Sequence, residues 1–242
     1  MAPWRSSPFF GPAHRSAALR LDCGRRTVQS PEVGKAGTSK GVRSILDGYA
    51  NDASALVPRF EAISSAELLA PVIDLLPAPP SRILEVGAGT GRDAAWLAGQ
   101  GHHIVAVEPV EQLRSAGMAL HPSSNIRWAD DRLPGLAELR RGREVYDLIL
   151  LIAVWQHLRP EQYSSALVNL GALTAPDGCL IMSLRHGPGS PQRPCFPALP
   201  EQVIRFAEEA GLSLIAHRKA DSVQRRNRDA GVTWSWLCFR RR

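Results

Sequence analysis

From residue 82 onward, short apolar runs alternate with segments whose apolar residues recur at helical spacing. The runs predict buried strands and the segments between them predict helices. The expected strands are Arg82–Val86, His103–Val107, Asn125–Ala129, Asp147–Ala153 and Cys179–Leu184. The expected helices are Asp93–Gln100, Glu111–Leu120, Leu136–Arg141, Glu161–Leu173 and Pro200–Ala210. This alternation with short loops is typical of a parallel sheet that helices cover on both faces.

The two ends of the chain depart from this alternation. Ser213–Arg218 and Thr233–Phe239 predict two strands joined by a long loop, and therefore a hairpin at one edge of the sheet. Residues 42–77 have helical spacing that we expect to break around Pro58 and to end at Pro77. Residues 1–41, rich in Pro, Gly, Ser and Arg, predict a disordered extension, although a transit peptide has a similar composition. One domain is thus expected over 42–242.

Composition and charge exclude several classes of protein. The formal net charge is +6, but much of the excess lies in the N-terminal tail and in the last three residues, Arg240, Arg241 and Arg242. No basic face for a nucleic acid is therefore indicated. No apolar run is long enough to span a membrane. The widely spaced cysteines fit reduced thiols in a cytoplasmic protein, and neither they nor the histidines have the spacing of a metal site.

The stretch ILEVGAGTGRD places three glycines, Gly87, Gly89 and Gly91, between the first expected strand and the helix after it. Glycines let such a turn double back and let a ligand approach bare backbone. The helix that follows offers free N–H groups and the positive end of its dipole. A doubly wound sheet binds its ligand beyond the carboxyl ends of its strands, where this turn lies. A merely tight turn would use glycines in the same way.

Acidic residues follow the strand ends in the pattern of a nucleoside site. Glu108 ends the second strand, where a carboxylate can accept both ribose hydroxyls, and Asp130 and Asp131 follow the third, where one of them can accept the adenine amine. Arg92 stands where a dinucleotide fingerprint needs its last glycine, which argues against a nicotinamide cofactor. S-adenosylmethionine lacks a pyrophosphate, and Arg92 could hold its carboxylate.

These motifs together resemble the class I S-adenosylmethionine-dependent methyltransferases. EVGAGTG is similar to their first motif, VAVEP to their acidic ribose-binding strand end, and WADDRLP to their adenine turn. YDLILLIAVWQHL and LTAPDGCLIMSL resemble their fourth-strand motif and the helix, turn and strand after it. The resemblance implies a Rossmann-like, doubly wound sheet of seven strands, mostly parallel with an antiparallel terminal strand, and S-adenosylmethionine as the cofactor.

The resemblance also implies roles for single residues. Glu85 would steady the glycine turn and the amino acid end of the cofactor, Glu108 would bind the ribose, and either Asp130 or Asp131 would bind adenine. The backbone of Ala153 and Val154 would meet the methionine end. The expected cofactor-binding residues are Glu85, Gly87, Ala88, Gly89, Gly91, Arg92, Glu108, Pro109, Asp130, Asp131, Ala153 and Val154.

Candidates for the acceptor side follow the fourth and fifth strands. Trp155 is either a wall beside the sulfonium or a core tryptophan, His157 either a base or a packing residue, and His186 either a substrate contact or a solvated loop residue. Tyr49 and Phe60 belong either to a lid over the cofactor, within residues 42–77, or to an ordinary buried helix face. Arg225, Arg226 and Arg228 either grip an acidic substrate or form a solvated charge run.

The sequence therefore predicts a methyltransferase that acts on a small molecule through an N, O or S nucleophile, with no extra domain to hold a macromolecule. Two alternatives stay open. One is a methyltransferase acting on RNA or protein, and the other is a subunit that binds S-adenosylmethionine without turnover. We expect a cytoplasmic enzyme without a metal or a membrane partner, and the sequence makes no prediction of the oligomeric state.

Overall fold

The computed structural model describes residues 36–242, with side chains from Ile45 onward. The strands are β1 (Arg82–Val86), β2 (His103–Val107), β3 (Ile126–Ala129), β4 (Tyr146–Leu151), β5 (Thr174–His186), β6 (Leu212–Asp221) and β7 (Thr233–Arg241). The α-helices are α1 (Ala36–Glu61), α2 (Ser65–Leu69), α3 (Arg92–Gly99), α4 (Glu111–Leu120), α5 (Ala137–Gly142), α6 (Tyr163–Leu173), α7 (Pro200–Glu209) and α8 (Arg225–Asp229). Short 3-10 helices are η1 (Ala70–Leu75), η2 (Trp155–His157) and η3 (Pro160–Gln162).

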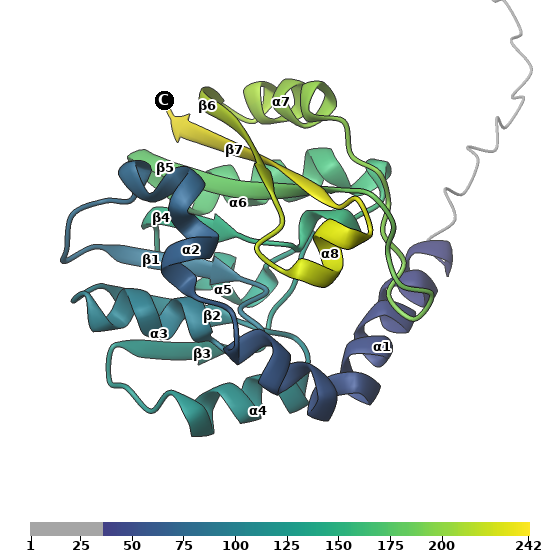
Figure 1. The fold of residues 1–242 in the computed structure, drawn as a ribbon. Coiled ribbons are helices and arrows are strands. Elements are labelled where there is room, and N and C mark those ends of the chain that lie inside the picture. The colour runs from purple at the N-terminus through teal and green to yellow at the C-terminus, as the bar shows by residue number, and fades with distance from the viewer. Residues whose placement is uncertain (1–35) are drawn as a thin grey trace, which may run out of the picture. The chain divides into compact units, whose positions relative to one another are not determined.

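All seven strands form one sheet in the order β3-β2-β1-β4-β5-β7-β6 (Figure 1). Strands β1 to β5 are parallel to one another, and β7 runs antiparallel to both β5 and β6. Strand order reverses between β1 and β4, so the carboxyl ends of these strands flank the ligand-binding crevice of a doubly wound sheet. The predicted fold class, with its antiparallel strand in a terminal hairpin, is confirmed.

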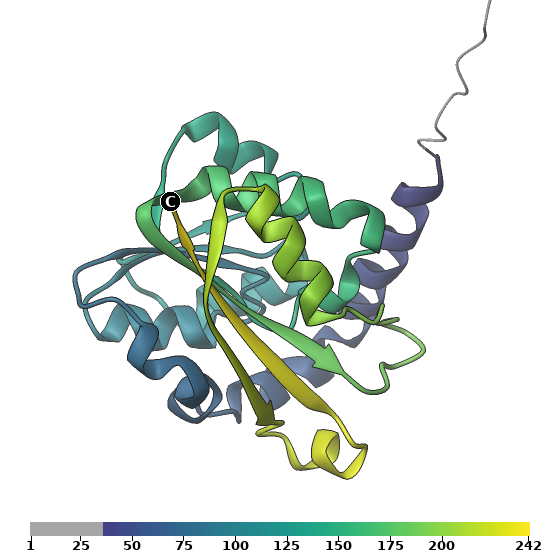
Figure 2. The same cartoon turned by 90° about the horizontal axis from the view of Figure 1, so that it is seen from above.

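Helices cover both faces of the sheet and build two separate cores. One core joins the sheet to α5, α6 and α7 through apolar side chains such as Leu139, Leu167 and Val203. The other joins it to α2, η1 and α3 through Leu69, Val72, Leu97 and their neighbours. Fully buried β1 residues serve both cores because successive side chains of a strand point to opposite faces. Figure 2 shows the helices above and below the twisted sheet.

The N-terminal helical region differs in detail from its prediction. Helix α1 runs through Pro58 and ends at Glu61, whereas we expected the break at the proline. A proline removes only its own N–H from the ladder, and its carbonyl still accepts a bond from the Ala62 N–H at 3.1 Å. The predicted boundary between 41 and 42 falls inside α1, and residues 1–35 of the predicted extension lie outside the described residues. Within 36–242 no helix combines the length and apolarity needed to cross a bilayer.

Strand β5 begins earlier than predicted, at Thr174 instead of Cys179. The segment APDG, expected to close the preceding helix as a turn, lies inside the strand as an irregularity: the register shifts between the Tyr146–Thr174 and Leu148–Cys179 pairs. Asp177 adopts a φ of 61° there. Such a bulge lets turn-forming residues stay within a strand. A second difference is the short helix α8, which occupies the predicted long loop between β6 and β7.

Candidate functional site

A cavity of about 490 Å³ opens where β1, β2, β3 and β4 end, and its size lies in the usual range of small-molecule sites, about 300–1,000 Å³. The loops that follow these four strands form one side of it. Helix α1, residues 188–195 and the segment around α8 complete its wall. The cavity therefore lies at the point where strand order reverses, as the sequence predicts.

The three glycines of the first loop all adopt left-handed backbone conformations. Their φ angles are 74° at Gly87, 60° at Gly89 and 73° at Gly91. A Cβ at Gly87 would also lie 2.4 Å from Val154 Cγ2, and one at Gly91 would lie 2.6 Å from the Trp128 ring. The loop thus needs glycine for its backbone angles at all three positions and, at two of them, for close packing.

Glu108 ties the glycine loop to the end of β2. Its Oε2 accepts the Gly89 N–H at 2.8 Å, and its Oε1 accepts the Val110 N–H at 2.9 Å. The side chain is buried and lines the cavity beside Pro109. Burial raises the pKa of the Glu108 carboxyl, while these two backbone bonds work in the opposite direction. Each carboxylate oxygen keeps further acceptor capacity for ligand hydroxyls.

Glu85 is a second buried acid in the cavity wall, at 3% exposure. Burial raises the pKa of its carboxyl well above the usual range, and the nearby Asp93 adds to the effect. Its Oε2 has no hydrogen-bond partner among the described residues. A buried carboxylate oxygen without a partner is costly, so a donor from a ligand would compensate it.

Arg92 and the two aspartates are placed differently from one another. Arg92 lines the cavity, but its Nε and Nη2 bind Asp93 at 2.9 and 2.6 Å, and its Nη1 donates to the Phe60 carbonyl at 2.8 Å. Asp131 is buried, and its carboxylate accepts the N–H groups of four residues, Arg132, Ala137, Glu138 and Leu139. Asp131 therefore fixes the start of α5.

Asp130 has a more open position. Its side chain is 67% exposed and its Oδ2 lies 3.4 Å from Arg114 Nη2. It is not among the residues that line the cavity, whereas Asp131 is. Asp130, which has free acceptor oxygens, thus lies outside the cavity wall. Asp131 lies in the wall, but its oxygens already accept backbone N–H groups.

The loop after β4 meets the cavity through its backbone. Ala153 adopts a φ of 56°, which is unusual for a residue with a Cβ, and its N–H donates to Ser183 Oγ at 2.8 Å. Gln156 Nε2 donates to the Ala153 carbonyl at 2.6 Å. Val154 packs against Gly87. These contacts hold the two predicted residues against the glycine loop.

His157 lies in the cavity wall with both ring nitrogens engaged. Its Nδ1 lies 3.2 Å from the Pro194 carbonyl and its Nε2 lies 2.9 Å from the Tyr49 hydroxyl. Because a carbonyl only accepts, Nδ1 carries the proton and Nε2 accepts from Tyr49. Burial lowers the pKa of His157 to about 4 and raises the pKa of Tyr49 to about 12. Both groups are therefore neutral near pH 7.

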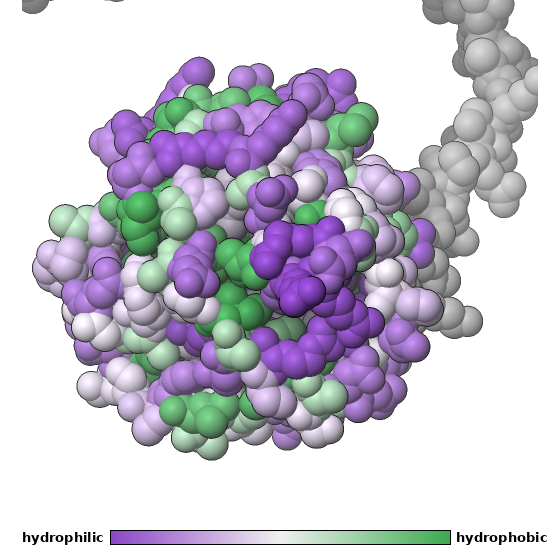
Figure 3. Space-filling view, viewed as in Figure 1, coloured by the Kyte–Doolittle hydropathy of each residue, from purple (hydrophilic) through white to green (hydrophobic). Residues whose placement is uncertain are grey.

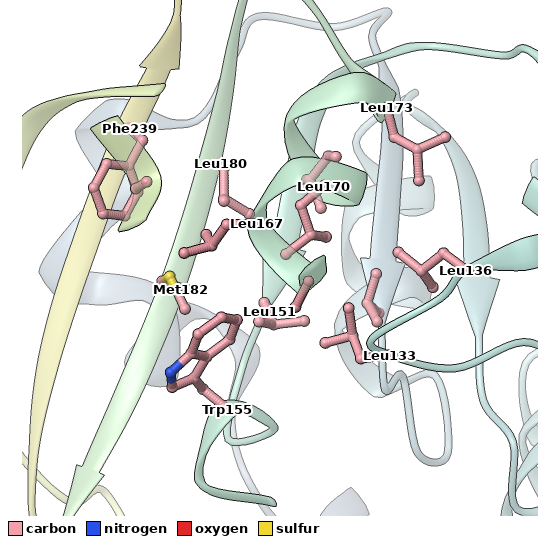
Figure 4. Close-up of a cluster of buried hydrophobic side chains, with 14 of the residues drawn as sticks. Leu133, Leu136, Leu151, Trp155, Leu167, Leu170, Leu173, Leu180, Met182 and Phe239 are labelled. Atoms are coloured by element: carbon pink, nitrogen blue, oxygen red, sulfur yellow. The ribbon is translucent and has the colours of Figure 1, made fainter. Parts of the chain in front are cut away.

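Two predicted acceptor-side residues lie away from the cavity. Trp155 is fully buried in the core between β5 and α6, where its ring centroid lies 4.8 Å from that of Tyr163, and Figure 4 shows its ring beside Met182. This corresponds to the core tryptophan that the sequence left as an alternative. His186 bonds Ser235 Oγ through Nε2 at 2.9 Å and does not line the cavity. Neither side chain is positioned to meet a ligand there.

Several cavity residues were missing from the predicted site. Gln156, Arg185, Arg193 and Trp234 all line it, although they come from separate loops and strands. Arg193 pairs with Asp52 of α1, and its guanidinium lies 5.1 Å from the Tyr49 ring centroid. Gln156 lies in the fourth-strand motif and Arg185 directly after the predicted strand Cys179–Leu184, but no motif contains Arg193 or Trp234.

A family model described as a methyltransferase domain matches residues 60–240, which is most of the chain. The chain belongs to this methyltransferase family. The motif-based assignment to the class I S-adenosylmethionine-dependent methyltransferases is thereby confirmed. The match spans every strand of the sheet and begins at the end of α1. The search of curated proteins found no match to this chain.

Solved structures share the fold of this methyltransferase. The 1,6-didemethyltoxoflavin-N1-methyltransferase from Burkholderia thailandensis, crystallised with 1,6-didemethyltoxoflavin and S-adenosylhomocysteine, is 22% identical, with a TM-score of 0.66 and coverage of 88% of this chain and 93% of that one. The N-methyltransferase NodS from Bradyrhizobium japonicum, in complex with S-adenosylhomocysteine, is 19% identical, with a TM-score of 0.56 and coverage of 73% and 85%. At these identities the likeness supports the fold alone.

The residues present fit S-adenosylmethionine. The unpartnered Oε2 of Glu85 suits an ammonium group, and the two oxygens of Glu108 suit a pair of ribose hydroxyls. Both acids line one cavity together with the left-handed glycines. S-adenosylmethionine is the cofactor of this methyltransferase.

Proposed function

We propose that this chain transfers a methyl group from S-adenosylmethionine to a small-molecule acceptor bound in the same cavity. The observation that carries the proposal is the Glu108 carboxylate, held 2.8 Å from the Gly89 N–H at the reversal of strand order. When bound, S-adenosylmethionine supplies an activated methyl group on a positively charged sulfur. Positioning and exclusion of water are then the main tasks left to the protein.

The residues at the ends of β1, β2 and β4 bind the cofactor. Glu108 accepts the ribose hydroxyls, Glu85 accepts the ammonium group, and the backbone of Gly87, Ala88 and Gly89 approaches the ligand. Ala153 and Val154 contact the methionine end, and Pro109 lines the nucleoside side. Asp131 keeps its role at the start of α5, which leaves Asp130 as the acceptor for the adenine amine if its exposed side chain turns inward.

Arg92 contributes through the shape of the loop. Its bonds to Asp93 and to the Phe60 carbonyl connect the start of α3 to the end of α1. The cofactor carboxylate then binds near the N-terminus of α3, where the helix dipole favours negative charge. The glycine at 91 serves the same turn by making room for Trp128.

His157 positions the acceptor wall in this proposal, and its surroundings disfavour a role as proton acceptor. A pKa of about 4 makes its imidazole a weak base, and its Nε2 is occupied by the Tyr49 hydroxyl. This bond holds α1 against the loop after β4. Helix α1 is the part of the predicted lid over residues 42–77 to which we assign the role of a cover.

The size of the cavity, about 490 Å³, supports a small molecule as the acceptor. Helix α1 and residues 188–195 line the acceptor side, joined by the Arg193–Asp52 ion pair and by the bond from Arg193 Nη1 to the Gly48 carbonyl at 3.4 Å. The B. thailandensis structure holds 1,6-didemethyltoxoflavin, which agrees with a small-molecule acceptor.

A transfer assay tests the proposal. The protein is incubated with S-adenosylmethionine labelled on the methyl group and with metabolite, RNA or protein fractions of a cell extract. We expect label and S-adenosylhomocysteine only with the metabolite fraction, and loss of both in Glu108→Gln. Glu111→Gln, an exposed acid on α4, is the control and should stay active. Label confined to RNA or protein would contradict the proposal.

A further inference from the structure

The charged residues of the cavity wall are unevenly distributed. The acids, Glu85, Asp93, Glu108 and Asp131, lie at or after the ends of β1, β2 and β3, where Arg92 and Arg132 also line the wall. The opposite side contains Arg185, Arg193 and Arg226 and no acid among the residues that the structure describes. Because Arg193 is neutralised by Asp52, the excess positive charge comes from the other two arginines.

Arg185 has the more enclosed position of the two. It stands on β5 directly opposite Trp234 of β7, and its guanidinium carbon lies 5.5 Å from the centroid of that indole. Its Nη2 donates to the Pro188 carbonyl at 2.8 Å and lies 3.5 Å from Asn227 Oδ1. These contacts orient the planar guanidinium along the cavity wall.

Arg185 is half-buried and has one unused donor. Its Nε–H is buried without a hydrogen-bond partner, and in residues 45–242 its side chain forms no ion pair. Burying an unpaired donor is costly. A planar guanidinium matches the geometry of a carboxylate better than that of most other partners.

The surroundings of Arg185 are aromatic. Trp236 lies two residues along β7 from Trp234 and opposite Ser183, so the two indoles share one sheet face with Arg185 and line the cavity. The outer surface over α8 is hydrophilic (Figure 3). Trp236 is buried in the core, so the half-buried Trp234 is the indole that can contact a planar molecule.

We propose that the methyl acceptor is a flat aromatic molecule with a carboxylate, and that Arg185 binds this carboxylate beside Trp234. This inference rests on the proposed function and names its substrate class. Arg226, the cavity arginine of α8, adds positive charge at the mouth, whereas its neighbours Arg225 and Arg228 do not line the cavity.

Binding of matched compounds to the protein loaded with S-adenosylhomocysteine tests the proposal. The probes are 4-hydroxybenzoate against 4-hydroxybenzamide and indole-3-carboxylate against indole-3-carboxamide, followed by quenching of tryptophan fluorescence. We expect a carboxylate to bind on the order of tenfold or more tightly than its amide, since the bond to a charged partner is lost in the amide. Equal binding within both pairs, or no binding of either carboxylate, would overturn it.

Variants assign the preference to a residue. Arg185→Gln should remove the preference for carboxylates, and Arg185→Lys should keep part of it because the positive charge stays. Arg225→Gln, whose side chain is 87% exposed on the same hairpin, is the control and should bind like the unmodified protein. An unchanged preference in Arg185→Gln would refute the proposal.

A separate measurement distinguishes this inference from the proposed function. Arg185 lies on the side of the cavity opposite Glu85 and Glu108. The Arg185→Gln variant should therefore bind S-adenosylhomocysteine with the same affinity as the unmodified protein. If the unmodified protein did not bind S-adenosylhomocysteine, the proposed function would be contradicted. Normal affinity with no carboxylate preference would contradict the substrate class alone.

Discussion

For some residues at the strand ends, sequence motifs are enough to predict the position. For others, the role is visible only in the structure. Glu108 and the glycines follow from the sequence because a parallel strand ends in the same geometry whatever the rest of the chain does. The roles of Asp131 and Trp155 do not, because hydrogen bonds to α5 and burial against α6 depend on segments distant in sequence. Residue type alone cannot separate a ligand contact from a packing contact.

The buried imidazole of His157 makes stability depend on pH. Its folded-state pKa is about 4, against 6.5 for the ordinary group, so the unfolded chain takes up this proton first. The free energy of unfolding should therefore fall as pH decreases from about 6.5 to about 4, by up to about 3 kcal/mol from this group. Urea unfolding measured across that range tests the prediction.

His157→Asn provides the comparison, because asparagine does not titrate. At pH 7 the free energy of unfolding of this variant should be lower than that of the unmodified protein. It should also change less between pH 6.5 and 4 than in the unmodified protein. His103→Asn, at an exposed position on β2, should keep the full pH dependence. An identical pH dependence in His157→Asn and the unmodified protein would show that His157 is not the group responsible.

At the scale of elements, the alternation of strands and helices was predictable because each buried strand and each amphipathic helix has its own period. The differences arose where turn-forming residues occur within an element. Pro58 lies in the last turn of α1, and APDG forms an irregularity inside β5, since tertiary packing outweighs local preference at both places. Helix α8 is too short to leave a periodic signal.

The glycine loop between β1 and α3 is the element on which binding depends most. Gly87→Ala would place a Cβ at a φ of 74° and 2.4 Å from Val154 Cγ2. We expect a loss of roughly 2–4 kcal/mol in stability and a strong loss of S-adenosylhomocysteine affinity. Thermal unfolding and calorimetry measure the two effects.

Gly99→Ala is the matched control for this loop. Gly99 ends α3, and a Cβ there would meet nothing within 4 Å. Because alanine favours the helix more than glycine does, this variant should be neutral or more stable by up to about 1 kcal/mol, with unchanged binding. If Gly87→Ala behaved like Gly99→Ala, the loop would not have the close packing described here.

At the scale of the whole molecule, the acceptor wall brings together α1, the loop after β4, residues 188–195 and the β6–β7 hairpin (Figure 1). Tyr49 and His157 are 108 residues apart in the chain and 2.9 Å apart in space. The loops on the cofactor side of the cavity could be predicted because they follow consecutive strands. The acceptor side could not, because its side chains come from segments that only the folded chain places together.

This arrangement predicts that ligand binding protects α1 from hydrogen exchange. Tyr49, Arg193 and Gly48 join α1 to the rest of the wall, so a filled cavity should slow exchange in residues 45–61 and 188–195. Helix α7 packs on the far face of the sheet and should exchange at the same rate with and without S-adenosylhomocysteine. Equal slowing of α7 and α1 would indicate general stabilisation instead of a cover.

Calorimetric titration of the purified protein with S-adenosylhomocysteine tests the central claim most directly. The account predicts one site per chain, an affinity reduced on the order of a hundredfold in Glu108→Ala, and no change in Glu111→Ala. NAD should give no heat. Absence of heat with S-adenosylhomocysteine, or full affinity in Glu108→Ala, would contradict the account.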